Sequence, residues 1–257
     1  MVIGIIGGSG LADVEGLEFG NEHTVNTPYG DTSAPIRQAD HNGIEVMFLA
    51  RHGAGHHLPP HSINYRANLW ALKHLGVDHI IAVNAVGGIT TNMGPEIIAL
   101  PDQLIDYTYG REHTFSSSGD DVLQHVDFSH PYDESLRKRL AAAFYRCNVN
   151  YQYGGVYGAT QGPRLETAAE VSKLERDGCD LVGMTGMPEA GLARELGIAY
   201  SSVCLVVNWA AGKSDSLITM AEIEAVMATG MNNVRRGLLG FLDSLHTVDS
   251  LATVDSI

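Results

Sequence analysis

The chain alternates short apolar runs with segments of helical periodicity along almost its whole length, and this alternation limits the folds open to it. The spacing predicts strands over residues 2–6, 44–50, 79–85, 96–107, 149–157, 180–183 and 199–208. It predicts helices over residues 64–75, 134–146, 165–177, 188–196 and 219–245. Strands that alternate with helices favour a mostly parallel sheet covered on both faces. We therefore predict an α/β fold of three layers, a central mixed, mostly parallel sheet flanked by helices.

One domain accounts for nearly the whole chain. With 257 residues, 44% of them hydrophobic, the chain can bury the core of one large α/β domain. No linker or change of composition divides it, so we predict a single domain over residues 1–246. Residues 247–257, which contain Thr-Val-Asp-Ser, are predicted to form a flexible tail.

The net charge of −14 argues against polyanionic partners, because such a surface repels nucleic acid and anionic membranes. We therefore predict no nucleic acid and no membrane as partners. A small anion remains open to the chain, since a few arginines and backbone N–H groups can build a local positive site.

The cysteines and the N-terminus indicate a cytoplasmic protein. Cys147, Cys179 and Cys204 are far apart and show no metal-binding spacing, which is typical of reduced thiols. The N-terminus lacks a basic region and is too short for a signal peptide. No apolar run approaches the roughly 20 residues that a membrane span needs.

Polar side chains flanked by glycines follow several of the predicted strands. Ligands of α/β sheets bind at the carboxyl ends of strands, so these side chains are expected to meet at one site. The five strand ends concerned carry Ser9, Arg51 and His52, Asn84 and Ala85, Met184 and Thr185, and Asn208.

Two of these strand ends suit a phosphate. Gly7-Gly8-Ser9-Gly10 can bring backbone N–H groups and a hydroxyl close to an anion, although it is equally suited to a tight turn. Arg51 can bind phosphate with two parallel hydrogen bonds and His52 can add a donor, unless Arg51 pairs with a structural carboxylate. The histidines around residue 52 lack nearby acidic ligands and a helical pair, so we expect no metal site.

Glu166 and Asn208 suit a purine base. A carboxylate only accepts hydrogen bonds, whereas a carboxamide donates and accepts. Together they match a base that presents an N–H beside a carbonyl, as hypoxanthine and guanine do. The alternatives are that Glu166 is a first-turn helix carboxylate and that Asn208 is a turn residue at a strand end.

These stretches resemble the purine nucleoside phosphorylase and methylthioadenosine phosphorylase family over most of the chain, from Gly7 to about Gly240. The motifs that carry the resemblance are Gly7-Gly8-Ser9-Gly10, Leu49-Ala50-Arg51-His52-Gly53, His61-Ser62-Ile63-Asn64-Tyr65-Arg66-Ala67-Asn68, Asn84-Ala85-Val86-Gly87-Gly88, Gly162-Pro163-Arg164-Leu165-Glu166-Thr167 and Gly183-Met184-Thr185 with Pro188-Glu189. The resemblance implies a pentosyltransferase that cleaves nucleosides with phosphate, usually a homotrimer. It also implies a mixed sheet partly closed into a barrel.

The resemblance also implies roles for individual residues. Phosphate, as co-substrate, would be bound by Ser9, Arg51, His52, Asn84, Ala85 and Thr185. The nucleoside would be bound by Met184 at the ribose and by Leu165, Glu166, Asn208, Trp209, Ala210, Met220 and Ile223. His125, in the polar excursion over residues 111–132, would reach a neighbouring subunit's site. Asn208 and Glu166 would act in catalysis, and no metal or other cofactor is expected.

Two departures from the family's adenine-specific pattern narrow the expected substrate. Asn208-Trp209-Ala210 replaces an Asp-x-Asp pair and Glu166 replaces a small residue, as in the 6-oxopurine enzymes. Near Ile223, where inosine enzymes carry a histidine for the 5′-hydroxyl, this chain has apolar Ile218, Met220 and Ile223. The combination predicts 5′-methylthioinosine as substrate.

Other functions remain open at this point. Within the family they are cleavage of inosine or guanosine and, after that, of methylthioadenosine. Outside it they are a phosphate-independent nucleoside hydrolase, a purine sensor and a nicotinamide-dependent oxidoreductase, although the first glycine loop lacks the dinucleotide fingerprint.

Overall fold

The computed structural model describes residues 1–8, 10, 11, 14, 16–116, 123, 125–215 and 217–252, with side chains described up to residue 245. The strands are β1 (Val2–Gly7), β2 (Phe19–His23), β3 (Ile36–His41), β4 (Ile44–Ala50), β5 (His79–Gly88), β6 (Ile98–Leu100), β7 (Gln103–Asp106), β8 (Tyr151–Tyr153), β9 (Val156–Ala159), β10 (Leu181–Gly183) and β11 (Ala199–Trp209). The helices are the short 3-10 turn η1 (Pro60–Ser62), α1 (Tyr65–His74), α2 (Glu134–Arg146), α3 (Ala168–Arg176), α4 (Gly186–Glu195) and α5 (Met220–Ala252).

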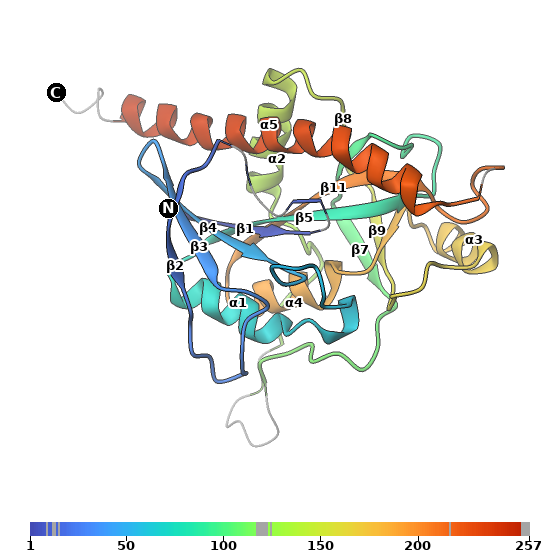
Figure 1. Ribbon diagram of the computed structural model, residues 1–257, viewed down its shortest axis with the longest axis horizontal. Helices are drawn as coiled ribbons and strands as arrows, with labels where there is room; N and C mark the ends of the chain where they lie inside the picture. The colour runs from blue at the N-terminus through green and yellow to red at the C-terminus, as the bar shows by residue number, and fades with distance from the viewer. Residues whose placement is uncertain are drawn as a thin grey trace.

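β5 lies at the centre of one mixed sheet (Figure 1). It pairs in parallel with β1 and β11, and its last residues pair antiparallel with β10. The main path of the sheet runs β2-β3-β4-β1-β5-β10-β9-β7, while β11 carries β6 and β6 carries β8. The sheet therefore branches at β5, and the polar ends of its strands face a common region.

Helices cover both faces of the sheet, as Figure 1 shows with α2 and α5 above it and α1 and α4 below it. Neighbouring residues of β1 supply the two faces, because side chains of a strand alternate in direction. Ile5 belongs to the core that contains Phe144 of α2 and Phe241 of α5. Ile6 belongs to the core that contains Leu69 of α1 and Leu192 of α4. The predicted three-layer α/β fold is confirmed.

Several element boundaries differ from the predicted ones for local reasons. The strand predicted over 96–107 is two strands, because Pro101 has no N–H for a ladder. The strand predicted over 149–157 is also two, divided by Gly154 and Gly155, whose φ values are +98° and +120°. β2 and β3 were not predicted, since neither shows a clean alternation of apolar and polar residues. α5 extends to Ala252, past the predicted end at residue 245, and residues 253–257 lie outside the described part.

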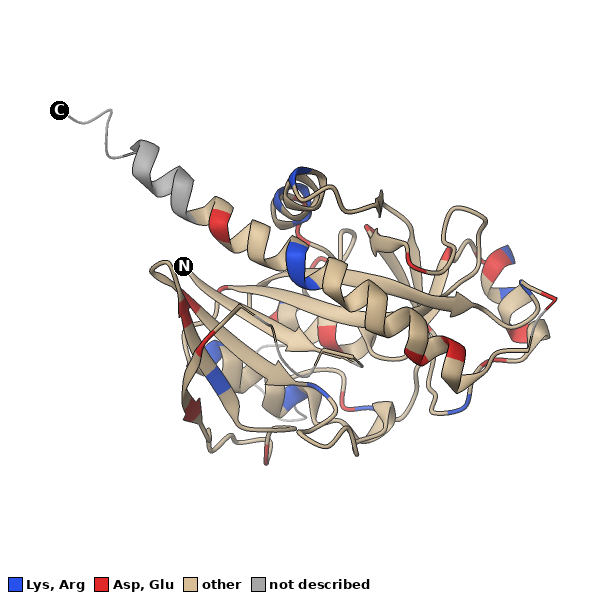
Figure 2. Ribbon diagram, turned by 45° about the horizontal axis from the view of Figure 1, so that its top comes forward, with Lys and Arg blue, Asp and Glu red and all other residues tan. Residues whose placement is uncertain are grey.

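Basic and acidic residues are scattered over the fold in the view of Figure 2, and Lys and Arg do not gather along one element. This distribution agrees with the overall charge of −14 in offering no extended basic surface. None of the helices in the described residues combines the length and the hydropathy that crossing a membrane would need.

Candidate active site

One pocket collects the strand ends that the sequence singled out. Arg51 and His52 follow β4, and Met184 and Thr185 follow β10. Asn84 and Ala85 lie within β5, which continues to Gly88 beyond its predicted end, and Asn208 is the residue before the last of β11. Ser9 lies outside the described residues, but its neighbour Gly8 lines the pocket. The remaining lining residues are Pro60, Val86, Gly87, Leu165, Glu166, Val182, Gly183, Val207, Ala210, Ala211, Ile218 and Ile223.

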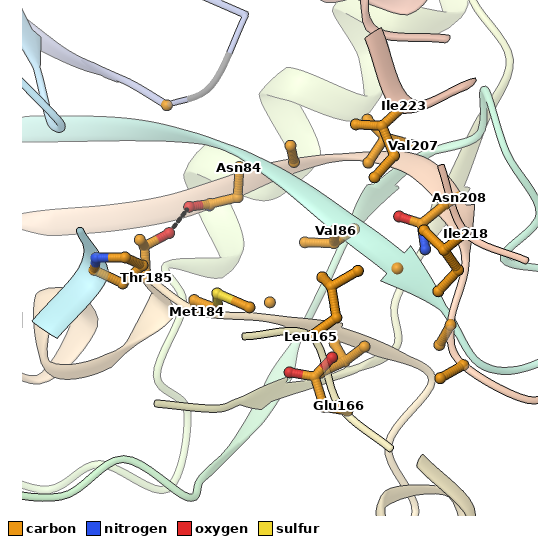
Figure 3. A pocket seen from close by; sticks show the side chains of 18 of the residues that line it. Asn84, Val86, Leu165, Glu166, Met184, Thr185, Val207, Asn208, Ile218 and Ile223 are labelled. Carbon is orange, nitrogen blue, oxygen red and sulfur yellow. Dashed lines mark hydrogen bonds between the residues drawn. The ribbon is translucent and has the colours of Figure 1, made fainter. Parts of the chain in front are cut away.

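The polar side chains are arranged in order along this pocket (Figure 3). Thr185 and Asn84 lie together at one end, joined by a hydrogen bond. Asn208 and Glu166 lie on opposite sides of the other end, and Met184 lies between the two ends. Polar groups are therefore available at both ends of the pocket, with Met184 between them.

Arg51 is fully buried and pairs with a carboxylate that the sequence did not suggest. Its Nε and Nη2 donate to the two carboxylate oxygens of Glu189 at 2.7 and 2.8 Å, and its Nη1 donates to the carbonyl of Val83 at 2.9 Å. Burial by itself would lower the pKa of Arg51, but the Glu189 carboxylate raises it well above its ordinary value. The alternative of a structural carboxylate partner thus applies. Only the N–H groups not used in these bonds are free for an anion.

Gly8 explains how the first loop comes close to this pair. A Cβ added at Gly8 would lie 2.5 Å from the carbonyl oxygen of Val83 and 2.9 Å from Nη1 of Arg51. Only glycine allows the backbone to pass this close to the buried guanidinium. The loop is therefore more than a simple turn, because its backbone is packed against Arg51.

His52 is neutral in the pocket. Burial lowers its pKa to about 4, and the charge of Arg51 lowers it further, although the hydrogen bond from Nδ1 to the carbonyl of Leu58 opposes the shift. A carbonyl can only accept, so Nδ1 carries the proton and Nε2 does not. The role of His52 toward phosphate stays a prediction; in the neutral ring Nδ1 donates to Leu58 and the free nitrogen, Nε2, is an acceptor.

The lowered pKa of His52 makes the stability of the fold depend on pH. The unfolded chain binds a proton near the ordinary pKa of 6.5, whereas the folded chain binds it only near 4. The contribution of neutral His52 to the free energy of unfolding is therefore fully present above about pH 6.5 and decreases as the pH falls toward 4. At pH 5 the loss is about 2 kcal/mol. Denaturant unfolding should show this loss in the wild type and a smaller one in His52→Gln. Replacing the exposed His61 with Gln serves as the control, and equal pH dependence in all the proteins would contradict this expectation.

Asn84 and Thr185, which line one end of the pocket, belong to a buried polar network. The Thr185 hydroxyl donates to Oδ1 of Asn84 at 2.8 Å, and Nδ2 of Asn84 donates to the hydroxyl of Ser202 at 2.6 Å. Asn84 is 1% exposed, so its amide is held in one orientation. The network fixes Thr185 at the N-terminus of α4, where backbone N–H groups favour an anion.

Asn208 is directed into the pocket by an irregularity in β11. The register with β5 shifts between Val206 and Asn208, which is the mark of a β-bulge. A bulge changes the direction of the side chains that follow it, and Val207 and Asn208 both line the pocket although they are consecutive. Nδ2 of Asn208 donates to the carbonyl of Trp209 at 2.7 Å, which leaves Oδ1 and the second N–H of the amide available.

Glu166 lies in the loop before α3 and not in the helix. Thr167 is the N-cap and forms a capping box with Glu170, so the helix predicted from residue 165 begins at Ala168. The alternative that Glu166 is a first-turn helix carboxylate is therefore wrong. Its Oε1 accepts a hydrogen bond of 2.6 Å from the hydroxyl of Thr160, which fixes the carboxylate at the pocket wall.

The remaining predicted residues are not all brought to this pocket. Leu165, Ala210 and Ile223 line it. Met220 is 63% exposed and lines an adjoining hollow that shares Ile223 with the pocket. Trp209 is not among the lining residues; its ring lies against Gly94, where an added Cβ would approach it at 3.2 Å, and its backbone carbonyl holds Asn208. His125 is exposed and lines neither hollow.

Glu189, Thr160 and Arg111 hold the lining residues in place, and sequence reasoning assigned them no role. Glu189 is the partner of Arg51, and Thr160 is the partner of Glu166. Arg111 donates to the carbonyl of Met184, which follows β10, and to the carbonyl of Gln161 in the loop that leads to Glu166. These three contacts join residues at least six positions apart in the chain, so local pattern carried no signal for them.

Within the described ranges, no group of three or more His, Cys, Asp or Glu side chains is placed to hold a metal ion. The histidines that follow β4 instead pack on one another, with the rings of His52 and His56 4.4 Å apart.

The sequence profile of the phosphorylase superfamily matches residues 2–243. A probable S-methyl-5′-thioinosine phosphorylase from Pseudomonas syringae pv. tomato is 55% identical over 243 residues, which cover 95% of this chain and 99% of the relative. A 6-oxopurine nucleoside phosphorylase from Pyrococcus furiosus is 45% identical over 230 residues, covering 88% and 86%. A solved methylthioadenosine phosphorylase from Schistosoma mansoni, in complex with adenine, superposes with a TM-score of 0.90 at 31% identity, covering 99% of this chain and 95% of that one.

Proposed function

Because this chain belongs to the phosphorylase superfamily, we propose that it catalyses the reversible phosphorolysis of S-methyl-5′-thioinosine. The products are hypoxanthine and S-methyl-5-thio-α-D-ribose 1-phosphate, and the role is purine salvage. The observation that carries the substrate assignment is the pair of Glu166 and Asn208 on opposite sides of the pocket, at the end away from Thr185.

This pair selects a 6-oxopurine through hydrogen-bond direction. The free acceptor capacity of Glu166 suits the N1–H of hypoxanthine, whereas adenine has no hydrogen at N1. The second N–H of the Asn208 amide suits the O6 carbonyl. Adenine would place an amino group against that N–H, and each such mismatch of a buried group costs about 1–3 kcal/mol.

The apolar side chains near Ile223 support a thioether at the sugar's 5′ position. Val207 and Ile223 are 5% and 8% exposed, and Ile218 lines the pocket beside them. None of these side chains can bond a 5′-hydroxyl, which would lose its hydrogen bond to water at a cost of about 1–3 kcal/mol. A methylthio group meets no such penalty, which corresponds to roughly a tenfold to hundredfold preference.

The mechanism follows from the order of groups along the pocket. The C1′–N9 bond breaks with its electron pair passing to the purine, and the ribosyl ring gains oxocarbenium character. N7 of the departing purine takes a proton from solvent water, and Oδ1 of Asn208 accepts the hydrogen bond of the resulting N7–H while Glu166 holds the base. A phosphate oxygen near Thr185, Arg51 and the Gly8 loop forms the new bond to C1′. Catalysis then consists of positioning and preorganised hydrogen bonds.

The phosphate contacts in this proposal differ from the simplest expectation. Ser9 and Ala85 would contribute alongside Thr185 at this end, and Asn84 acts through the Thr185 hydroxyl. Neutral His52 would accept a hydrogen bond from a protonated phosphate oxygen. Inorganic phosphate is the co-substrate, and the proposed reaction uses no other cofactor.

Cleavage of inosine or guanosine is the second candidate function. The 45% identical relative from Pyrococcus furiosus is named as a 6-oxopurine nucleoside phosphorylase, and it is consistent with the same base-reading pair. Inosine differs from methylthioinosine only at the sugar's 5′ position, and guanosine carries a 2-amino group in addition. Methylthioadenosine comes third because it lacks the 6-oxo group.

We further propose a cytoplasmic homotrimer in which His125 of one subunit approaches the sugar's 5′ end in the next. The exposed position of His125, outside the pocket of its own chain, is compatible with this role. Sedimentation velocity would give the number of subunits, and a monomer of full activity would remove the role of His125.

Steady-state assays with three nucleosides test the proposed function. We expect kcat/KM for methylthioinosine to exceed that for inosine by about tenfold to hundredfold, with methylthioadenosine below both. Product formation should require phosphate. Base release without phosphate would indicate a hydrolase, and dominance of inosine would move the assignment to the second candidate.

A further inference from the structure

Arg111 does not line the pocket but bonds two segments beside it, residues 160–161 and residues 184–187. We call these segments the Glu166 wall and the Met184–Thr185 wall. Arg111 is 7% exposed and stands at the start of the excursion that follows β7. Its Nη1 donates to the carbonyls of Met184 and Met187 at 2.8 and 2.7 Å. Its Nη2 donates to the carbonyls of Thr160 and Gln161 at 3.3 and 2.9 Å. One guanidinium thus bonds two segments that are otherwise separate in the chain.

The side chain also makes two weaker contacts that fix its plane. Its Nε donates to Oε1 of Gln161 at 3.2 Å, and Nη1 lies 3.3 Å from the hydroxyl of Tyr65. Every nitrogen of the guanidinium is therefore engaged. A planar fork with five donors can satisfy this many acceptors at once, which the single ammonium of lysine cannot do.

Arg111 differs from the other buried arginines in having only neutral partners among the described residues. Arg51 pairs with Glu189, and Arg137 pairs with Glu134. The hydrogen bonds of Arg111 end on five oxygens of carbonyl or amide groups and on one hydroxyl. A buried cation held by neutral oxygens keeps its full positive charge next to them, so it binds them more strongly than a neutral donor would.

The segments held by Arg111 carry the groups that would contact the substrate. Thr160 donates to Glu166, the predicted base-reading carboxylate. Met184 lines the pocket at its middle, and Thr185 follows it directly. The two segments also pair directly, since the backbone N–H of Thr160 donates to the carbonyl of Gly183 at 2.8 Å. The guanidinium adds bonds to Gln161 and Met187 on either side of that pairing, so it holds the base-reading loop and the sugar-binding segment beyond the point where the strands end.

We propose that Arg111 is a positioning residue, which fixes the Glu166 wall relative to the Met184–Thr185 wall and so sets base preference and sugar placement. This inference rests on the proposed function, because it assigns the two walls to base and sugar. Arg111 does not itself line the pocket and acts through the carbonyls it binds.

Arg111→Lys is the main test, since it keeps the charge and loses the fork. We expect kcat/KM for methylthioinosine to fall by about 10- to 100-fold with a raised nucleoside KM, because a displacement of about 1 Å at a reacting group costs that much. The preference for methylthioinosine over methylthioadenosine should also fall by several-fold. A merely structural role would lower the melting temperature and the active fraction but leave KM and the preference unchanged.

Arg137→Lys is the matched control. Arg137 is 4% exposed and also donates to a backbone carbonyl, that of Leu100, but it lies outside the pocket. Its replacement should change stability without changing KM or the preference. If Arg137→Lys altered both as Arg111→Lys did, or if Arg111→Lys altered neither, the inference would be overturned.

Gln161→Met tests the same contact more mildly, in case the Arg111 variants do not fold. It removes the oxygen that Nε of Arg111 binds while leaving the arginine in place. We expect a smaller shift of KM and preference in the same direction, and wild-type values would count against the inference. A wild-type protein that cleaves no nucleoside would instead refute the proposed function, so the two failures are distinguishable.

Discussion

Replacement of Asn208 by alanine is expected to lower kcat for methylthioinosine by about 100- to 1000-fold, with a much smaller rise in KM. The reason is that Oδ1 of Asn208 is held ready by the bond from Nδ2 to the Trp209 carbonyl, and the N7–H that it accepts forms only as the purine departs. An interaction made only in the transition state changes kcat and leaves ground-state binding nearly constant. Steady-state kinetics over a range of nucleoside concentrations at saturating phosphate would measure both constants.

The exposed Asn92 offers a matched control for this experiment, since it lies outside the pocket and its side-chain oxygen accepts from the hydroxyl of Thr90. Asn92→Ala should retain wild-type kinetics. Unchanged kcat in Asn208→Ala would remove the proposed role of the amide, and a change confined to KM would restrict that role to binding.

Glu189→Gln is expected to lower the free energy of unfolding by about 3–5 kcal/mol, because it leaves the Arg51 charge buried without its counter-ion. Both side chains of the pair are fully buried, so neither can recover the lost interaction by turning to water. Chemical denaturation followed by a spectroscopic signal would measure the loss. A change below about 1 kcal/mol would be typical of an exposed pair and would contradict the buried geometry.

A double variant separates the structural role of Arg51 from its proposed contact with phosphate. Arg51→Met combined with Glu189→Gln removes both charges and keeps an amide oxygen that can accept the hydrogen bond now made by Tyr200. Stability should recover most of the loss, since replacing a whole buried pair is often neutral. The KM for phosphate should nevertheless rise, and a wild-type phosphate KM would confine Arg51 to a structural role. Arg164→Gln, which breaks an exposed pair, is the stability control and should cost at most about 1 kcal/mol.

Arg51 is a residue whose position follows from the sequence and whose partner does not. The sequence placed it correctly after β4 and allowed two partners, an anion or a structural carboxylate. The choice depends on Glu189, which lies 138 positions later in the chain. No local pattern could connect them, because their contact exists only once α4 has packed beside the end of β4.

For Glu166, in contrast, the local sequence contained the signal that decides where helix α3 begins. Thr167 followed three positions later by Glu170 is a capping box, which marks a helix beginning after Glu166. The prediction of a helix from residue 165 relied on apolar spacing and overlooked this cap. Glu166 thereby belongs to a loop, whose carboxylate can turn toward the pocket and toward Thr160.

The sequence by itself determined the central strands, the covering helices and the polar residues near several strand ends, because alternation and helical spacing are local properties of the chain. β2 and β3 lack such a pattern and became visible only in the structure. The sequence also determined the chemical types available at the pocket, an acid and an amide at one end and hydroxyl, guanidinium and glycine at the other. Only the tertiary structure decided how those groups are directed. The bulge in β11, the Arg51–Glu189 pair and the bonds of Arg111 all depend on segments distant in sequence. Hydrogen bonds form wherever packing brings donors and acceptors together, so their partners follow from the fold and cannot be inferred from periodicity.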